Sequence, residues 1–230
     1  MAQITQYPKH VGIIPDGNRR WCGANGISYQ TGYELSFEKC IDLCVYIMQL
    51  GCHEVSIYMC SRENLNRPEE ELIMLYNSIT ATLPKIDERL SNFADILHVG
   101  SMNDLPKPIT NAMNHHHIRH ASDYKHISDK KNFRLNLLIH YSPIDEIEWA
   151  YQKHIDKKQD EGRFTTYLWV KNPVQLTIRT AGVSILSNFL PLQTAYSLIW
   201  TTSKFAPELT TDDAANAIEF FQEIGIKWGR

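Results

Sequence analysis

Short runs of apolar residues along the chain alternate with longer stretches in which apolar residues recur every three or four positions. The apolar runs predict buried strands at 11–14, 55–59, 94–99, 133–140, 174–178 and 195–200. The helical spacing predicts helices between and after them, at 32–51, 68–82, 105–124, 144–154 and 211–221. Strands that alternate with helices are typical of a parallel sheet covered on both faces. We therefore expect a single α/β domain over 1–230, with a central, mainly parallel six-stranded sheet flanked by helices.

Three polar loops directly follow predicted strands. They lie around Asp16, at 61–67 and at Arg179. In parallel sheets, ligands bind outside the carboxyl ends of the strands. The three loops can therefore converge on one site.

The first of these loops carries the groups that a phosphate site needs. Asp16, Gly17 and Asn18 are turn residues, and Arg19 and Arg20 follow them. The backbone N–H groups of such a turn can cradle phosphate oxygens, the arginines can bind them in a fork, and the acid can hold a divalent cation. An ordinary strand-to-helix turn with two solvated arginines explains the same pattern, and composition does not separate the two.

The overall composition narrows the class of protein. Hydrophobic residues make up 43% of the 230 residues, enough for a substantial core, and the formal net charge is −3, so no global basic field favours nucleic acid. No apolar segment approaches the roughly 18 residues of a membrane span, and the first residues lack a signal-peptide layout. We expect a cytoplasmic protein that binds no nucleic acid and makes at most peripheral membrane contact.

The cysteines and histidines do not predict a metal centre. The five cysteines are an odd number without a Cys-x-x-Cys pair, which argues against a disulfide framework or a structural zinc site. The histidines at 115–117, with His120 and His126, have no cysteine or carboxylate at ligand spacing. A solvated helix face is the favoured interpretation of that tract.

Three motifs together resemble the cis-prenyltransferases, the family of the undecaprenyl diphosphate synthases. Ile-Pro-Asp-Gly-Asn-Arg-Arg-Trp at 14–21 is similar to a family pattern of apolar residues followed by Met-Asp-Gly-Asn-Gly-Arg-Trp. The sequence at 58–68 resembles Tyr-x-Phe-Ser-x-Glu-Asn-Trp-x-Arg-Pro, and Ile-Arg-Thr-Ala-Gly at 178–182 begins the third motif, which continues to 196. The motifs occur in the family's order and span nearly the whole chain.

The resemblance implies a homodimer with a hydrophobic tunnel beside the sheet, and Mg²⁺ bound at Asp16. It implies catalytic roles for three residues, of which the last two would assist proton handling: Asp16, Ser61 and Asn64. It implies that the allylic diphosphate is held by Gly17, Asn18, Arg19, Arg20, Tyr33 and Arg67. The diphosphate of the second substrate, isopentenyl diphosphate, would be bound by Arg179 and Ser187.

Among the departures from the family pattern, three concern residues expected at or near the ligands. Tyr33 replaces a histidine, Ile185 replaces a second arginine of the isopentenyl diphosphate site, and Leu198 replaces a glutamate that helps to bind Mg²⁺ across the dimer. Each charge-assisted contact contributes about 1.5–3 kcal/mol. Losing two of them predicts that isopentenyl diphosphate binds more weakly by several orders of magnitude.

The resemblance, with these departures, therefore implies a prenyltransferase that ionises a short allylic diphosphate, such as dimethylallyl, geranyl or farnesyl diphosphate, with Mg²⁺. The prenyl cation would pass to an acceptor in a short-chain or irregular coupling, while Mg²⁺ and guanidiniums stabilise the departing anion. One alternative is a terpene synthase or diphosphate lyase that quenches or cyclises the cation without isopentenyl diphosphate. The other is a non-catalytic partner or prenyl-lipid binding protein, against which the retained Asp16 and Arg20 argue, since such a protein needs no ionisation site.

Overall fold

All the strands in the described part of the chain lie in one parallel sheet. The structure, a computed structural model, describes residues 6–103, 105–123, 131–157 and 162–225. Within these ranges the sheet has seven strands in the order β4-β3-β5-β2-β1-β6-β7, and each neighbouring pair is parallel. Their bounds are β1 (His10–Ile14), β2 (Glu54–Ser61), β3 (Ala94–Val99), β4 (Arg119–His120), β5 (Phe133–Tyr141), β6 (Leu176–Arg179) and β7 (Leu198–Thr201).

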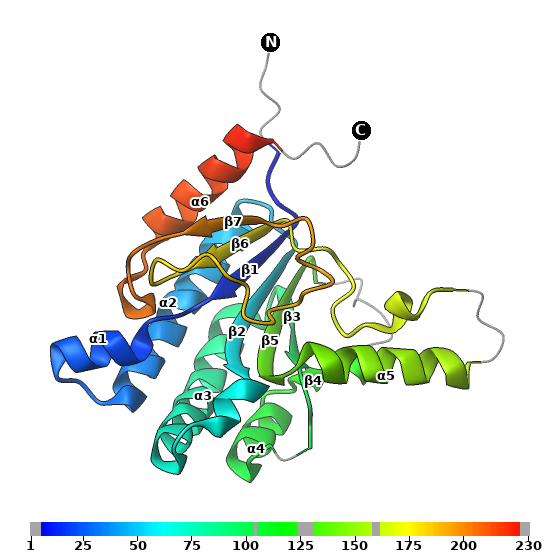
Figure 1. The fold of residues 1–230 in the computed structure, drawn as a ribbon, viewed down its shortest axis with the longest axis horizontal. Helices are drawn as coiled ribbons and strands as arrows, with labels where there is room; N and C mark the ends of the chain where they lie inside the picture. Colours follow the sequence, from blue (N-terminus) through cyan, green and yellow to red (C-terminus); the bar gives the residue numbers. More distant parts are fainter. Residues whose placement is uncertain (1–5, 104, 124–130, 158–161, 226–230) are drawn as a thin grey trace.

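Helices connect these strands and pack on the sheet (Figure 1). The α-helices of the described ranges are α1 (Asn18–Asn25), α2 (Tyr29–Gln49), α3 (Glu69–Leu90), α4 (Lys107–His115), α5 (Pro143–Asp156) and α6 (Thr211–Ile224). The short 3₁₀ helices are η1 (Arg62–Asn66), η2 (Ala121–Asp123), η3 (Phe164–Tyr167) and η4 (Ala206–Glu208).

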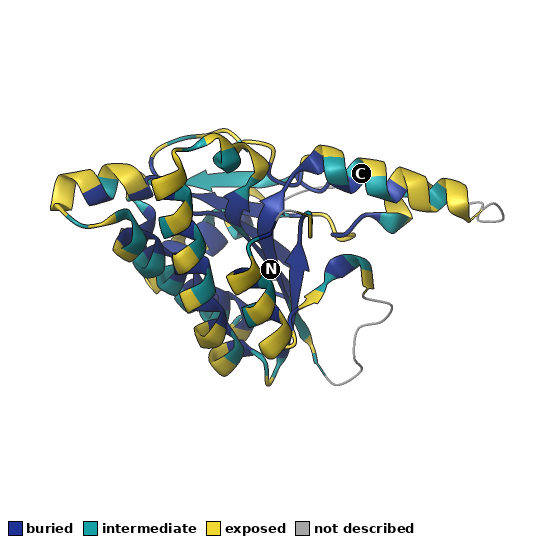
Figure 2. Cartoon of the chain, turned by 90° about the horizontal axis from the view of Figure 1, so that it is seen from below, coloured by how far each residue is buried: buried dark blue, intermediate teal, exposed yellow. Residues whose placement is uncertain are grey.

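Side chains of the central strands enter two different cores, one on each face of the sheet. Val11, Ile13 and Ile57 pack with apolar residues of α2, α3, α4 and α6 in the larger core. Ile14 and Leu138 belong to a smaller core on the other face, with residues of the segment 169–190. Figure 2 shows the buried strands between the exposed outer faces of the helices. The strands are thus buried on both faces, as their near-continuous apolar sequences require.

The fold class and the six predicted strands agree with the structure, but the predicted count of six is too low. The additional strand is β4, which has only two residues and lies inside the segment 105–124 that was predicted to be helical. That helix, α4, ends at His115 because the chain turns through His117, which has a positive φ of 53°. The histidine tract is therefore not one helix face. His116 pairs with Asp87 at 2.9 Å, and His126 lies outside the described residues.

Two further differences concern helices. The spacing predicts that the helix after Pro68 ends near 82, whereas α3 continues through Pro84 to Leu90. Ile86 and Leu90 are fully buried, so packing outweighs the hydrogen bond that the proline removes. The short helix α1 was predicted only as a turn. None of the helices in the described ranges combines the length and apolar character needed to cross a bilayer.

Candidate active site

The loop after β1 leads into the start of a helix. Gly17, at φ 90°, precedes α1, which has no acidic residue in its first turn. The Gly17 N–H donates to Asp16 Oδ1 at 2.6 Å, and in the described part of the chain no side chain accepts from the N–H groups of Asn18, Arg19 and Arg20. A Cβ on Gly17 would lie 2.3 Å from the Phe205 ring, so only glycine fits this close approach. The open N–H groups and the helix dipole favour an anion here. The Arg20 guanidinium lies above Phe205, 5.2 Å from its ring centroid.

Asp16 connects this loop with the loop after β6. Its backbone N–H donates to Thr180 Oγ1 at 2.7 Å, and Thr180 Oγ1 in turn donates to the Asp16 carbonyl at 2.7 Å. The Asp16 carboxylate accepts from Arg179 Nη2 at 2.8 Å and lies 3.9 Å from Arg20 Nη2. Arg179 Nη1 donates to Ser187 Oγ at 2.9 Å and to the carbonyl of Ile185. Asp16 and Arg179 thus form a direct ion pair.

The loop after β2 brings Ser61, Asn64 and Arg67 to the same place. Ser61 ends β2, and its N–H donates to Asn64 Oδ1 at 3.1 Å across η1. Arg67 Nη1 donates to the Tyr33 hydroxyl at 2.7 Å and lies 3.1 Å from Glu71 Oε1. Burial raises the pKa of Tyr33 to about 12, so its hydroxyl is protonated at neutral pH.

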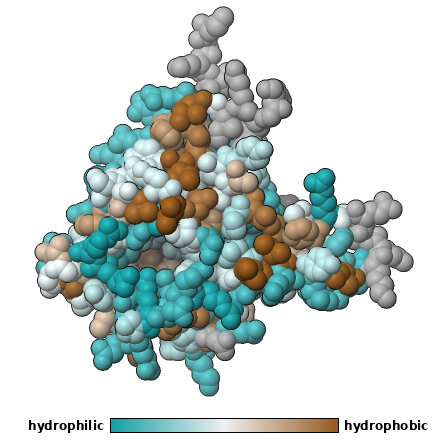
Figure 3. Space-filling view, viewed as in Figure 1, coloured by the Kyte–Doolittle hydropathy of each residue, from teal (hydrophilic) through white to brown (hydrophobic). Residues whose placement is uncertain are grey.

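Two adjoining hollows collect these side chains. A cavity of ≈ 220 Å³ has both polar and apolar side chains in its lining, which includes Asp16, Asn18, Tyr33, Phe37, Met59, Ser61, Asn64, Arg67, Leu75, Arg179 and Ser187. A second hollow of ≈ 470 Å³ is lined by the start of α1 together with Arg67 and two tyrosines: Pro15, Asp16, Gly17, Asn18, Arg19, Arg20, Tyr29, Tyr33 and Arg67. In the space-filling view, a recess with a pale brown floor and a hydrophilic rim opens on the side of α1 (Figure 3).

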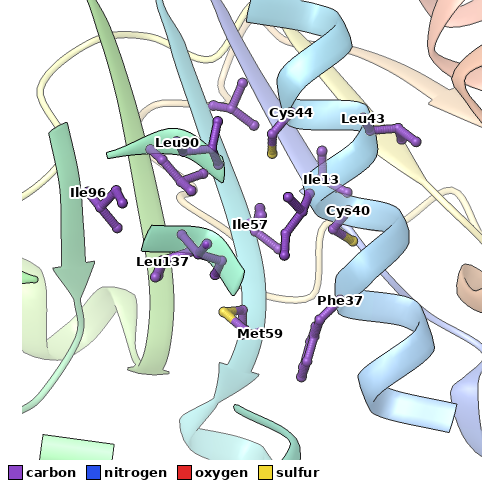
Figure 4. Close-up of a cluster of buried hydrophobic side chains, with 14 of the residues drawn as sticks. Ile13, Phe37, Cys40, Leu43, Cys44, Ile57, Met59, Leu90, Ile96 and Leu137 are labelled. Atoms are coloured by element: carbon purple, nitrogen blue, oxygen red, sulfur yellow. The ribbon is translucent and has the colours of Figure 1, made fainter. Parts of the chain in front are cut away.

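The apolar end of the smaller cavity is closed by packed side chains. Phe37 and Met59 lie toward the carboxyl end of β2, and Cys40, Cys44 and Ile57 fill the space behind them (Figure 4). Those three residues are at most 1% exposed. Phe37 and Met59 in the cavity lining are themselves only 2% and 4% exposed, and the three residues behind them do not line the cavity.

The family follows from comparison with known proteins. The Prenyltransf family model, described as "Putative undecaprenyl diphosphate synthase", matches residues 14–229. The chain belongs to this family of prenyltransferases. An isoprenyl transferase from Aquifex aeolicus is 31% identical over 230 residues, covering 97% of this chain and 96% of that protein. A tritrans,polycis-undecaprenyl-diphosphate synthase (geranylgeranyl-diphosphate specific) from Methanopyrus kandleri is 32% identical, covering 97% and 85%.

Solved structures of the family have the same fold. Lavandulyl diphosphate synthase from Lavandula x intermedia, solved with dimethylallyl diphosphate, matches with a TM-score of 0.81 at 23% identity, covering 94% of this chain and 95% of that one. An undecaprenyl diphosphate synthase from Campylobacter jejuni, described as probable, matches with a TM-score of 0.74, also at 23% identity, covering 94% and 96%. The family resemblance and the α/β fold expected from the sequence are confirmed, and the chain is a prenyltransferase.

The residues predicted for the site lie together, although their individual roles stay predictions. All eleven line one or both hollows: Asp16, Gly17, Asn18, Arg19, Arg20, Tyr33, Ser61, Asn64, Arg67, Arg179 and Ser187. Three further residues were not predicted from the sequence: Glu71 contacts Arg67, Thr180 bonds to Asp16, and Phe205 packs under Arg20. Leu198 lies elsewhere in this chain: it pairs with Leu176 at the start of β7, whereas Arg179 is at the opposite end of β6.

Proposed function

We propose that this prenyltransferase ionises a short allylic prenyl diphosphate and transfers the prenyl cation in a short-chain or irregular coupling. One observation supports the proposal most strongly: a cavity of ≈ 220 Å³, with Phe37, Met59 and Leu75 in its lining, adjoins an arginine-rich helix start. The diphosphate would lie against α1, and the prenyl chain would enter the cavity between α2, α3 and β2. The short chain length is inferred from the closure of the cavity near Phe37 and Met59.

The residues near α1 fit a magnesium–diphosphate complex. Mg²⁺ in such sites takes one or two carboxylates and fills its other positions with phosphate oxygens and water. Asp16 supplies one carboxylate, and Asn18 Oδ1 is buried with no hydrogen-bond partner in the described part of the chain. No group of three or more His, Cys, Asp or Glu side chains within the described ranges could hold a metal by itself. The donor set therefore fits a cation that is shared with the substrate.

The protein groups would act on the charge that develops as the allylic C–O bond breaks. Bound Mg²⁺ would neutralise part of the charge on the departing diphosphate. The first-turn N–H groups of α1 and the side chains of Arg20 and Arg67 would bind its oxygens, and the apolar wall at Phe37 would exclude water from the cation. Ser61 and Asn64, held together by their hydrogen bond, are placed to assist proton removal after coupling.

A second candidate function is cleavage of the same substrate without isopentenyl diphosphate, as in a terpene synthase or diphosphate lyase. The observation that favours it is the second-substrate side of the site. Arg179 is already bound to Asp16, Ser187 and the carbonyl of Ile185, and the Ile185 side chain is 59% exposed. A second diphosphate would find no further arginine at position 185.

The proposal also covers the oligomeric state of the protein and its location in the cell. We infer a homodimer, as the family resemblance implies, and a cytoplasmic location without nucleic-acid partners. Exposed Ile144, Tyr151 and Ile155 lie along α5, and apolar residues gather on that helix in Figure 3. Such a stripe on a protruding helix supports an interface between chains.

Product analysis tests the proposal. The purified protein would be incubated with dimethylallyl, geranyl or farnesyl diphosphate, with and without isopentenyl diphosphate and with Mg²⁺ or EDTA. A short coupled diphosphate product that requires Mg²⁺ supports the transferase. Diphosphate release from the allylic substrate alone, with a hydrocarbon or alcohol product, supports the lyase. Long-chain products would contradict the inferred chain length, and no release from any substrate would refute both functions.

A further inference from the structure

Glu71 is the one buried acid among three at the start of α3. Glu69, Glu70 and Glu71 all lie in the first turn, where negative charge stabilises a helix. Glu69 and Glu70 are exposed, whereas Glu71 is only 7% exposed. Burying a carboxylate costs free energy unless partners satisfy it. The helix dipole therefore does not explain why the third acid is turned inward.

The Glu71 carboxylate connects three helices at the rim of the site. Its Oε1 lies 3.1 Å from Arg67 Nη1 and accepts from the Tyr33 hydroxyl of α2 at 3.3 Å. Its Oε2 lies 3.5 Å from Nη1 of Arg19 on α1. Tyr33 completes a triangle, because its oxygen also accepts from Arg67 Nη1 at 2.7 Å. The phenol is thus an acceptor toward the guanidinium and a donor toward the carboxylate.

These contacts fix the guanidinium of Arg67 by one of its nitrogens. Both the Tyr33 and the Glu71 contact use Nη1, while Arg67 lines both hollows of the site. Nη2 and Nε are therefore the N–H groups that can bind a ligand. A long arginine side chain loses much rotamer freedom when it binds an anion, and a guanidinium that is already oriented loses less.

We propose that Glu71 is a positioning residue, which with Tyr33 orients the Arg67 guanidinium to receive the diphosphate of the allylic substrate. The inference rests on the proposed function for the identity of that ligand. Glu71 touches no substrate in this account and acts through Arg67. Tyr33 accordingly orients Arg67 rather than binding the diphosphate itself.

A simple Coulomb argument predicts the opposite effect. Glu71 is a negative charge beside an anion site, so removing it by substitution should strengthen diphosphate binding. Positioning predicts that the same substitution weakens binding. The sign of the change therefore separates the two explanations. Glu70 provides the matched control, because it lies on the same turn, carries the same charge and is exposed.

Binding of inorganic diphosphate to the full chain with Mg²⁺, measured by titration calorimetry, provides the test. We expect Glu71→Gln to raise the Kd about tenfold, the loss of one charge-assisted contact, and Glu70→Gln to leave it unchanged or lower it. In an Arg67→Gln background, Glu71→Gln should weaken binding no further, because its effect passes through Arg67. Binding by Glu71→Gln that equals or exceeds that of Glu70→Gln would overturn the proposal, as would a full tenfold loss in the Arg67→Gln background.

A second variant covers the case in which Glu71→Gln does not fold, as judged by circular dichroism. Tyr33→Phe keeps the Glu71–Arg67 ion pair and removes only the hydroxyl, and we expect the Kd to rise about threefold; an unchanged Kd would overturn the proposal. The proposed function fails separately, if the wild-type chain binds inorganic diphosphate but releases none from any allylic substrate. A wild-type chain that binds no diphosphate would overturn both.

Discussion

Phe37→Ala is expected to lengthen the prenyl chain that the site accepts. Phe37 is 2% exposed, lies on the third turn of α2 and lines the 220 Å³ cavity together with Met59. A cavity of about 150 Å³ accommodates benzene, which corresponds to about 25 Å³ per carbon atom. The wild-type cavity therefore holds at most about nine carbon atoms, enough for a dimethylallyl group and nearly enough for a geranyl group.

The substitution removes a phenyl group and so opens about 150 Å³ more, slightly over the volume of one five-carbon unit. Each methylene that moves from water into an apolar site gains about 0.8 kcal/mol. We therefore expect kcat/KM for farnesyl diphosphate, relative to geranyl diphosphate, to rise at least about tenfold. The cost is a loss of about 3 kcal/mol in the free energy of unfolding, near the lower end for Phe→Ala because one side of the ring already faces a cavity.

Release of inorganic diphosphate from each allylic substrate is the appropriate assay, because it reports ionisation whatever the acceptor. Phe221→Ala is the matched control: Phe221 is 5% exposed on α6, in the same core but not in the lining of the cavity. It should destabilise the protein without changing the order of substrates. An unchanged preference in Phe37→Ala, or an equal change in Phe221→Ala, would refute the assignment of the cavity to the prenyl chain.

Four further outcomes are expected. Asp16→Asn should reduce turnover at least about a hundredfold while leaving the thermal midpoint within a few degrees, and diphosphate-release kinetics would measure it; wild-type-like turnover would remove Asp16 from the mechanism. EDTA should abolish diphosphate release, and added Mg²⁺ should restore it. Ile185→Arg should lower the KM for isopentenyl diphosphate, and an unchanged KM would contradict the expected weak binding of isopentenyl diphosphate beside Arg179. Lys204 and Thr210 lower the pKa of Asp213 despite its burial. The Asp213 carboxylate therefore stabilises the fold above the ordinary aspartate pKa near 4, and this stabilisation is lost as the pH falls through the lower pKa of the folded state. In denaturant titrations at different pH values, Asp213→Asn should lack this part of the pH dependence of stability.

Strands were predicted well because burial on both faces leaves a local signal. The apolar runs that form β1, β3 and β5 are visible without any tertiary information. Helix ends were predicted less well because packing decides them. Pro84 predicts an early end of α3, yet the burial of Ile86 and Leu90 carries the helix onward.

The candidate site was predictable as a set of loops but not as a set of contacts. Parallel strands place their carboxyl ends at one edge, so the loops at Asp16, 61–67 and Arg179 had to meet. The place of Glu71 in the first turn of a helix does not indicate that it turns inward while its two neighbours face solvent, since that depends on contacts with Tyr33 and Arg67. The signal that could have found it is local: Arg67 and Glu71 are four residues apart across a helix start.

The two proposed diphosphate sites, at the start of α1 and at Arg179, differ because their arginines have different partners. Arg67 contacts Glu71 through Nη1 and lines both hollows, and Arg20 extends over Phe205 at the start of α1. Arg179 is committed to Asp16 and Ser187, and its Nε is buried without a partner in the described ranges. A ligand at the site near α1 therefore meets arginines with N–H groups to spare. A ligand at Arg179 must compete with the ion pair between Arg179 and Asp16. Since position 185 adds no second guanidinium, we expect the site to bind one diphosphate more tightly than a second one.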